Sequence, residues 1–219
     1  ENNKFTNFGF RKVLTSAKES LVSGVFSSVA DKYDLMNDAM SFGLHRLWKK
    51  DLVKLADVQE GQHILDIASG TGDLPILFAP KIGSDGKIYV TDINADMLNL
   101  AKQKLFNKGI AHNIEFCIAN TEELQFTDNK FDTISISFGL RNVTHKEKAI
   151  SEMYRVLKPG GKLLIMEFSQ VQSEILKKIY ELYSCHVIPK IGKLITGDQD
   201  SYQYLVESIK MHPNQIALQ

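Results

Sequence analysis

The sequence predicts an α/β fold in which a mostly parallel, doubly wound sheet follows a helical N-terminal cap. Between about residues 61 and 169, short apolar runs alternate with segments of helical periodicity, and glycine or proline separates them. Such alternation builds a parallel sheet with right-handed crossovers. The first apolar run leads into a Gly-x-Gly turn, which is typical of a nucleotide-binding core.

Length and composition bound the protein before any motif is considered. The 219 residues, 43% of them hydrophobic, suffice for one domain: a cap over about 1–60, a nucleotide-binding core over 61–169 and C-terminal helices over 170–219. A net charge of zero gives no electrostatic reason to expect nucleic acid. Two isolated cysteines, Cys117 and Cys185, indicate a reducing, cytoplasmic compartment. No apolar run approaches the ~20 residues of a membrane span.

The first 60 residues predict helices and no convincing strand. Residues 20–31 place leucine and valine on one side of an amphipathic helix. Residues 34–38 mix polar and apolar side chains and are interpreted as a turn. After a break at Phe42-Gly43, residues 45–56 predict a second helix.

The core elements follow in order along the chain. Strands are expected at 63–67, 87–92, 114–119, 131–137 and 162–168. Helices are expected at 74–81, 95–108 and 145–157, with a short turn near 121–123. Residues 158–161, Lys-Pro-Gly-Gly, are interpreted as a turn before the fifth strand, and helices are expected again at 175–188 and 201–211.

The turn at residues 68–73 carries the first chemical signal. Gly70 and Gly72 allow positive φ and a close approach of a ligand to the backbone. A dinucleotide site needs a third glycine, where Pro75 stands, and this disfavours a dehydrogenase. Asp66 and Asp73 flank the turn and favour a cation over a pyrophosphate. The pattern D-x-A-x-G-T-G-D resembles the first motif of the class I S-adenosylmethionine-dependent methyltransferases.

Ligands of an open parallel sheet bind at the carboxyl ends of its strands, so the residues at those ends are the candidates for ligand binding. Asp92 ends the second strand and can accept hydrogen bonds from ribose hydroxyls; the alternative is that it or Asn94 caps the next helix. Asn120 ends the third strand and can read an adenine edge, or form a polar turn. The fourth strand ends at Ser137, where methyl donor and acceptor should meet.

Two longer stretches resemble the ubiquinone/menaquinone biosynthesis C-methyltransferases. One covers residues 25–38 and 40–49, and the other is Ile-Ser-Phe-Gly-Leu-Arg-Asn-Val-Thr at 136–144. Residues 154–161 are shared more widely among methyltransferases, and the likeness runs from about residue 8 to 215. That family continues into two further strands, which this sequence lacks, so the strand at 162–168 is expected to be an uncovered edge.

The resemblance implies a class I Rossmann-like fold and an S-adenosylmethionine-dependent enzyme. Its acceptor would be a polyprenylated benzoquinol or naphthoquinol, methylated at a ring carbon by a cytoplasmic protein peripheral to the inner membrane. Carried over by position, cofactor contacts fall at Thr71, Asp92, Asn120, Thr121 and Ser137. With Asp66, Gly70 and Gly72 of the turn, and Ile93 beside Asp92, these form the expected cofactor site.

Arg141 leads the candidate catalytic residues. Its guanidinium stays protonated, so we expect it to stabilise a phenolate or orient a base; the alternatives are a surface salt bridge or a carbonyl brace. Asn142 can orient either reactant. Tyr33 and His45 in the cap are further candidates, and His45 is the best-tuned base by type, although it is also an ordinary residue for a helix start. The mechanism needs no metal, and the sequence shows no clustered metal ligands.

Other readings stay open at this level. A methyltransferase acting on another small molecule or lipid would share the turn and Asp92 but not the two signatures, and a non-catalytic binding module would be expected to lose Asp66, Gly72 or Asp92. A homodimer or a quinone-biosynthesis complex is compatible with the sequence. The segment His45–Lys50 pairs cations with apolar residues and is the candidate membrane contact.

Overall fold

The computed structural model describes residues 4–168, 182–183, 187 and 199–213. Their contacts group into two units, one formed by Arg46–Glu167 and the other by Glu1–His45 together with Phe168–Gln219. The boundary falls inside the predicted cap, and the ends of the chain share one unit. The assignment of one domain in three consecutive segments stays a prediction.

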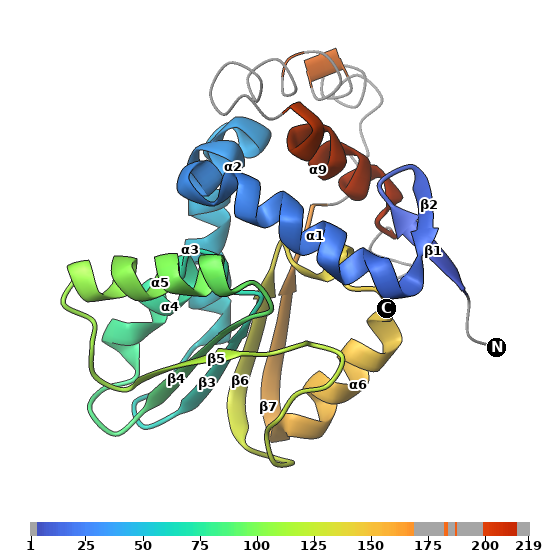
Figure 1. Ribbon diagram of the computed structural model, residues 1–219. Coiled ribbons are helices and arrows are strands. Elements are labelled where there is room, and N and C mark those ends of the chain that lie inside the picture. Colours follow the sequence, from blue (N-terminus) through green and yellow to red (C-terminus); the bar gives the residue numbers. More distant parts are fainter. Residues whose placement is uncertain (1–3, 169–181, 184–186, 188–198, 214–219) are drawn as a thin grey trace. The chain divides into compact units, whose positions relative to one another are not determined.

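A five-stranded parallel sheet forms the centre of the Arg46–Glu167 unit (Figure 1). Its order is β5-β4-β3-β6-β7, so the chain progresses in opposite directions on the two sides of β3. The strands are β3 (His63–Ile67), β4 (Lys87–Asp92), β5 (Ile114–Ile118), β6 (Phe131–Ser137) and β7 (Leu157–Met166). Predicted bounds are confirmed for β3, β4 and β6, and β5 ends one residue early. The order places a topological switch point between β3 and β6, where such sheets bind ligands.

The fifth strand corrects the predicted turn at residues 158–161. β7 begins at Leu157, which pairs with Phe131, whereas Lys162 pairs with Thr133, so the intervening residues form an irregularity in the ladder. Gly160 takes a φ of +78°, which glycine adopts without strain. The sequence prediction placed proline and glycine in a turn before a strand at 162–168, but an edge strand tolerates both at a bulge, and β7 runs from Leu157 to Met166. In the described residues β7 lies at the end of the sheet, paired with β6.

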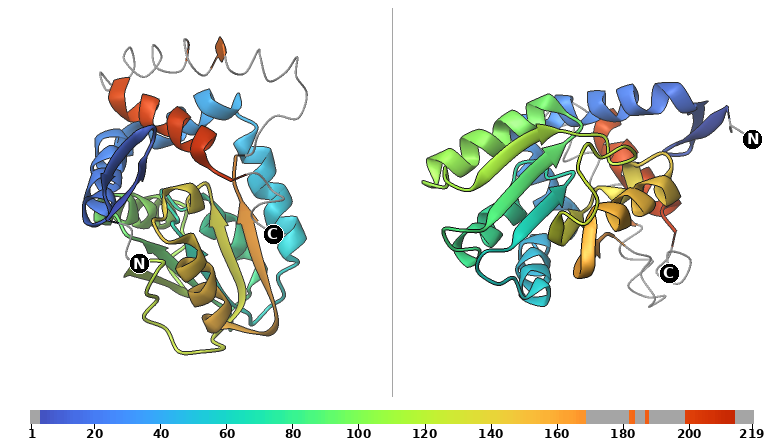
Figure 2. Two further views of the ribbon diagram at one scale, coloured as in Figure 1. Left: turned by 90° about the vertical axis from the view of Figure 1, so that its right-hand side faces the viewer. Right: turned by 90° about the horizontal axis from the view of Figure 1, so that it is seen from below.

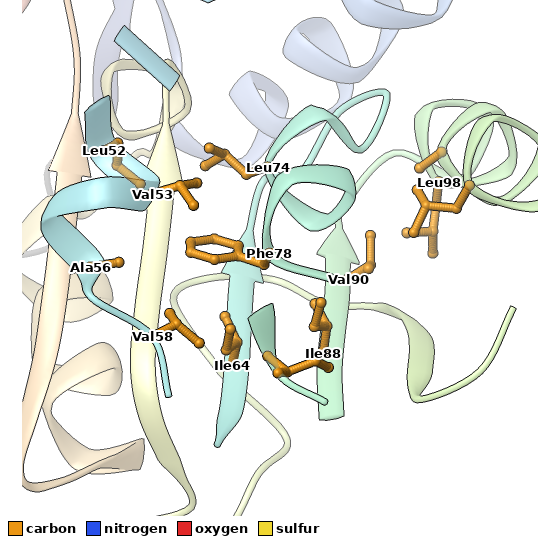
Figure 3. Packing of buried hydrophobic residues seen from close by; sticks show 13 residues of the cluster. Leu52, Val53, Ala56, Val58, Ile64, Leu74, Phe78, Ile88, Val90 and Leu98 are labelled. Atoms are coloured by element: carbon orange, nitrogen blue, oxygen red, sulfur yellow. The ribbon is translucent and has the colours of Figure 1, made fainter. Parts of the chain in front are cut away.

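Helices α3 (His45–Ala56), α4 (Asp73–Phe78) and α5 (Ala95–Asn107) cover one face of this sheet, and Figure 3 shows their contact with β3 and β4. Phe78 is fully buried among them. Residues of one strand alternate between faces, so Ile64, Ile88 and Val90 point into the same apolar layer. That layer is made of Leu52, Val53, Ala56, Val58, Ile64, Leu74, Phe78, Ile82, Ile88, Val90, Leu98, Ala101 and Leu105.

The opposite face holds a smaller aromatic cluster. The Tyr89 ring lies edge-on to Phe131 at 5.2 Å and to Phe126 at 5.6 Å, measured between centroids. Phe126 belongs to the long connection between β5 and β6. Arg155 of α6 (Lys146–Val156) fixes that connection, because its guanidinium donates to the carbonyls of Leu124 and Phe126 at 2.8 Å.

The second unit contains a β-hairpin that the sequence did not predict. β1 (Phe5–Phe8) pairs antiparallel with β2 (Arg11–Leu14) and precedes α1 (Thr15–Val29). Phe8 stacks on Tyr204 of α9 (Gln199–Met211) at 4.1 Å between ring centroids. The ribbon of Figure 2 (left view) shows the hairpin beside α9. The prediction of no strand was wrong because each strand has only 4 residues and its stabilising helix lies nearly the whole chain length away.

A second correction concerns residues 34–38, which are helical rather than a turn. They lie inside α2 (Tyr33–Ser41), where Met36 and Asn37 are buried. The helix ends at Phe42, which takes the left-handed conformation with φ +53°. The predicted helix at 45–56 is confirmed as α3 and that at 201–211 as α9, while most of 175–188 lies outside the described residues.

Candidate active site

The Gly-x-Gly turn joins β3 to α4 and is tied to β4. Ser69 N–H donates to the Thr91 carbonyl at 2.9 Å, and Thr91 N–H donates to Ser69 Oγ at 3.2 Å. Gly70 and Gly72 take φ values of +55° and +81°, as the glycine pair predicted. A Cβ on Gly72 would approach Leu105 Cδ1 of α5 to 2.7 Å. The second glycine is therefore required both by its backbone angle and by the close approach of α5.

Asp92 ends β4 with both carboxylate oxygens engaged. Oδ2 accepts from Gly70 N–H and Oδ1 from Asn94 N–H, each at 2.9 Å. Burial raises the pKa of this carboxyl group, and the two N–H donors oppose that rise. Asn94 caps α5, since its side chain accepts from Met97 N–H at 3.0 Å. The helix cap thus belongs to Asn94, and ribose binding by Asp92 stays a prediction; Ile93 lies half-buried between them.

Asp66 faces the neighbouring strand from within the sheet. Its Oδ1 accepts from Ser135 Oγ of β6 at 2.5 Å, and the residue is buried. Burial raises the pKa of Asp66 to about 7, although hydrogen bonds from Ser135 and Ser69 and the charge of Lys49 act in the opposite direction. This carboxyl group links β3 to β6 at the switch point.

Asp73, the first residue of α4, lies between two lysines that the sequence analysis did not connect with the site. Lys49 Nζ is 2.7 Å from Oδ2 and Lys104 Nζ is 2.6 Å from Oδ1. Burial acts to raise the pKa of Asp73, but the two ammonium groups outweigh it and hold the pKa well below its usual range. Lys104 also donates to Thr71 Oγ1 at 3.4 Å, so the predicted cofactor residue Thr71 belongs to this cluster.

Lys49 corrects the predicted membrane contact. The sequence grouped it with exposed cations, but the residue is only 6% exposed. Its ammonium group pairs with Asp73 and lies 5.9 Å from the centroid of the Phe138 ring. The charge of Lys49 therefore belongs to the site and not to an exposed surface of α3.

The loop after β6 lies directly against the Gly-x-Gly turn. A Cβ on Gly139 would come within 2.6 Å of Ala68 Cβ, so only glycine allows this approach. Ser137 ends β6, Phe138 takes a φ of +57°, and Leu140–Asn142 form a 3-10 turn that carries Arg141 and Asn142. The structure thus brings the predicted cofactor turn and the predicted acceptor loop together.

Arg141 forms a buried ion pair with Glu167. Nη1 lies 2.7 Å from Glu167 Oε1, and Arg141 N–H donates to Oε2 at 3.1 Å. Nη1 also donates to the Phe138 carbonyl. The carbonyl brace considered for Arg141 exists, and the salt bridge is buried rather than at the surface. Glu167 was missed, although applying the strand-end rule to the fifth strand would have found it.

Asn120 follows β5 and shapes its own turn. Its Oδ1 accepts from Glu122 N–H at 2.8 Å, as in an Asx turn, and Thr121 lies between the two residues. Glu122 Oε1 in turn accepts from the N–H groups of Thr144 and His145 at 3.0 and 2.9 Å. The predicted adenine turn is therefore connected to the far end of the loop that carries Arg141.

Tyr33 and His45 belong to the other unit. Tyr33 is the first residue of α2, and its ring lies edge-on to Phe26 at 5.9 Å. His45 is buried, and its Nε2 lies 2.9 Å from Asp38 Oδ1. The catalytic roles predicted for both residues stay predictions.

Three further features concern the described residues, 4–168, 182–183, 187 and 199–213. No cluster of three or more His, Cys, Asp or Glu that could hold a metal occurs in them. None of their helices combines the length and the apolar character needed to cross a membrane. A groove of about 670 Å³ lies at the amino ends of β4 and β5, away from the residues above, and is lined in part by Ile82, His112 and Asn113.

The site fits a cationic nucleoside cofactor better than a dinucleotide. Asp66, Asp73 and Asp92 surround the turn, where a pyrophosphate would need cations, and both lysines beside it already neutralise Asp73. S-adenosylmethionine carries a sulfonium, an ammonium and free ribose hydroxyls. Carboxylates attract the two positive charges and accept hydrogen bonds from the ammonium and the hydroxyls.

Solved structures share the fold. A S-adenosylmethionine-dependent methyltransferase from Aquifex aeolicus aligns with a TM-score of 0.53 at 25% identity, over 57% of this chain and 66% of its own. A putative S-adenosylmethionine-dependent methyltransferase from Methanococcus maripaludis aligns over 84% of both chains with a TM-score of 0.57; at 19% identity it shows the fold alone. Fold and site together define a class I S-adenosylmethionine-dependent methyltransferase.

The sequence narrows this class further. The chain belongs to the ubiE/COQ5 methyltransferase family, whose model matches residues 14–219. Proteins named ubiquinone/menaquinone biosynthesis C-methyltransferase UbiE from Yersinia enterocolitica and Yersinia pseudotuberculosis are 54% identical over 213 residues. The alignments cover 97% of this chain and 85% of each relative.

Proposed function

We propose that this methyltransferase acts on a ring carbon of a polyprenylated quinol in ubiquinone and menaquinone biosynthesis. The acceptors are demethylmenaquinol and 2-polyprenyl-6-methoxy-1,4-benzoquinol, one or both. Family membership and the names of the 54% identical relatives support this proposal. The structural observation that carries it is the contact of Gly139, in the quinone-family signature, with Ala68 of the cofactor turn. Another small-molecule acceptor is the less favoured alternative.

The cofactor residues are proposed by position. Asp92 accepts hydrogen bonds from the ribose hydroxyls, and Asn120 and Thr121 hold the adenine. The rest of the cofactor is contacted by Thr71, Ser137, Asp66, Gly70, Gly72 and Ile93. S-adenosylmethionine supplies an electrophilic methyl group when bound. The buried carboxyl groups of Asp66 and Asp92, on either side of this turn, bind and orient the cofactor, and bulk water is kept from much of their surface.

Arg141 and Asn142 are proposed to act on the acceptor. A ring hydroxyl that loses its proton leaves negative charge on oxygen and, by delocalisation, on the ortho carbon. The guanidinium of Arg141 stabilises this charge while staying protonated itself. Asn142 orients the ring, and Tyr33 and His45 are the proposed residues for proton handling. His45 is oriented through Nε2 by Asp38, as a general base requires.

Methyl transfer to a soluble short-chain quinol tests the function. The purified protein is incubated anaerobically with reduced demethylquinol and S-adenosylmethionine that carries an isotopic label in its methyl group. We expect the label on a ring carbon of the product, located by mass spectrometry and NMR. Label on oxygen, or none with either quinol class, would overturn the proposal.

The role of Arg141 has its own test. Arg141→Ala should reduce turnover by roughly 10²–10³, the usual scale for removing one transition-state donor. Cofactor affinity should barely change, because the guanidinium is proposed to act on the acceptor and not on the cofactor. If activity per folded molecule is normal and only thermal stability falls, Arg141 acts as a brace.

A peripheral membrane contact through α3 is also proposed. On its exposed side Leu47 and Leu55 are 55% and 72% exposed, and Lys50 and Lys54 lie beside them. A helix face of this composition binds at the interface of an anionic membrane. The second cation of this membrane contact is Lys54 and not Lys49, because Lys49 is buried.

A further inference from the structure

The sequence motifs of the site include Arg141 but do not explain its ion pair with Glu167. The Arg141 side chain is 0% exposed and that of Glu167 is 5% exposed. Glu167 directly follows Met166, the last residue of β7. Charges so deeply buried are retained only where they are paired and hydrogen-bonded, and removing one partner leaves the other uncompensated.

One carboxylate holds both the backbone and the side chain of Arg141. Oε2 accepts from the Arg141 N–H at 3.1 Å, and Oε1 accepts from Nη1 at 2.7 Å. Phe138, whose carbonyl accepts from the same Nη1, donates its own N–H to the Met166 carbonyl at 2.8 Å. The end of β7 therefore sets the orientation of the guanidinium, although the two residues are 26 positions apart.

We propose that Glu167 is the positioning residue for Arg141 in methyl transfer: it holds the guanidinium in place and moderates the positive field at the ring oxygen. The inference rests on the proposed function, because it needs an acceptor whose ring hydroxyl ionises. During that ionisation the O–H bond breaks, its electron pair stays on oxygen, and the proton passes to the base proposed above, while Arg141 keeps its own protons.

The other charged groups around the pair determine whether loss of the Glu167 charge raises or lowers the pH at which the ring hydroxyl ionises. Lys146 of α6 interacts electrostatically with Glu167 and Glu122, which raise its pKa, while the larger effect of burial lowers it. Lys49 of α3 lies 5.9 Å from the Phe138 ring centroid and is paired with Asp73. Removing the charge of Glu167 thus leaves Arg141 and Lys146 less compensated. The ring hydroxyl should then ionise at lower pH.

The test compares Glu167→Gln with Glu122→Gln in the full chain. Both changes keep the side-chain shape and remove one negative charge beside the same loop, but only Glu167 contacts Arg141. Glu122 holds the other end of the loop through Thr144 and His145. The measurements are kcat and KM for the soluble short-chain quinol, their pH profiles, and the Kd of S-adenosylmethionine by calorimetry.

For Glu167→Gln we expect kcat to fall at least tenfold while the cofactor Kd changes less than twofold. The pH midpoint of kcat should move down by about one unit, as expected for one charge removed at short range. Glu122→Gln changes the compensation of Lys146 and removes no contact of Glu167 with Arg141, so it should shift the midpoint clearly less. An unshifted midpoint in Glu167→Gln, or an equal shift in both variants, would overturn the inference.

A second variant covers the case in which Glu167→Gln does not fold. Glu167→Asp keeps the charge but shortens the side chain, so the midpoint should stay and kcat should fall; wild-type kcat would contradict a positioning role. The wild-type rate separates this inference from the proposed function. If the wild type methylates no quinol, both fail, whereas a normal wild-type rate with unaffected variants overturns the inference alone.

Discussion

Asp66 and Asp92 show how position in the sheet differentiates two residues of one type. Asp66 points from the middle of the switch point towards Ser135, whereas Asp92 ends its strand and accepts two backbone N–H groups. Burial raises the pKa of both carboxyl groups. Asp66 is thereby suited to holding two strands together, and Asp92 to receiving a ligand at a strand end.

Asp66→Asn should make the free energy of unfolding less dependent on pH. The pKa is about 7 in the folded chain against an ordinary value of 3.8, so between these pH values the unfolded chain has lost a proton that the folded chain keeps. The contribution of Asp66 to stability is fully present below pH 4 and is lost as pH rises through 7, by about 4 kcal/mol. Asparagine remains neutral. Urea unfolding at pH 4.5 and 7.5 should show the variant gaining relative to wild type at the higher pH; parallel pH dependences would contradict this account.

Asp92→Ala should weaken S-adenosylmethionine binding about tenfold or more. Hydrogen bonds to a charged acceptor are worth about 1.5–3 kcal/mol each. Asn94→Ala is the matched control, because it removes the α5 cap next to Asp92 but leaves the carboxylate. Calorimetry should give near wild-type affinity for the control. Unchanged affinity in folded Asp92→Ala would rule out ribose binding by this residue.

At the scale of elements, the Gly-x-Gly turn depends on how closely α5 approaches it. Gly72 is the N-cap of α4 at φ +81°, with Leu105 and Ala101 of α5 against the place where a side chain would lie. Gly109, just after α5, has a similar φ of +73° but no atom within 4 Å of its ideal Cβ. The two positions share the backbone requirement and differ in the steric one.

Gly72→Ala should therefore destabilise the protein more than Gly109→Ala. A left-handed non-glycine residue costs roughly 1–2 kcal/mol, and overpacking at Gly72 should add about 1–3 kcal/mol. Urea unfolding of both variants measures the difference. Equal losses of unfolding free energy in the two variants would show that α5 shifts to make room without a free-energy cost. Only the backbone angle would then matter.

The exposed side of α3 gives a second prediction for an element. Replacing Lys50 and Lys54 by Ser should weaken binding to anionic vesicles by roughly 30-fold, since each lysine near such a surface contributes about 1 kcal/mol. Replacing Lys102 and Lys108, exposed lysines of the α5 region, serves as the control and should have little effect. Vesicle flotation compares the three proteins. If the wild type does not float with anionic vesicles, α3 is not a membrane contact.

At the scale of the whole molecule, the chemistry limits the redox state of the acceptor. An oxidised quinone is electron-poor and has no hydroxyl to ionise, so it cannot attack a methyl sulfonium. Methyl transfer in an anaerobic assay should therefore require an added reductant. Equal rates with strictly oxidised quinone would disprove the phenolate route.

Much of the sheet was predictable because its information is local. Three strands had their predicted bounds, since parallel strands buried on both faces are continuous apolar runs between breakers. The same local patterns predicted the Gly-x-Gly turn, α3 and the positions of Asp92, Asn120 and Ser137 at or near the ends of strands. The errors fell where local pattern misleads: a bulged strand that contains proline, a helix with turn-like composition and a hairpin of two short strands.

The sequence by itself determined the class of this protein, because the cofactor turn and the family signatures are short, contiguous patterns. The tertiary structure alone decided how the charges are used. Lys49 meets Asp73 across 24 positions, Lys104 meets it across 31, and Arg141 meets Glu167 across 26. Such pairs form where the switch point and the covering helices bring distant segments together. Which cation neutralises which carboxylate depends on burial and distance, and neither is encoded in the local order of residues.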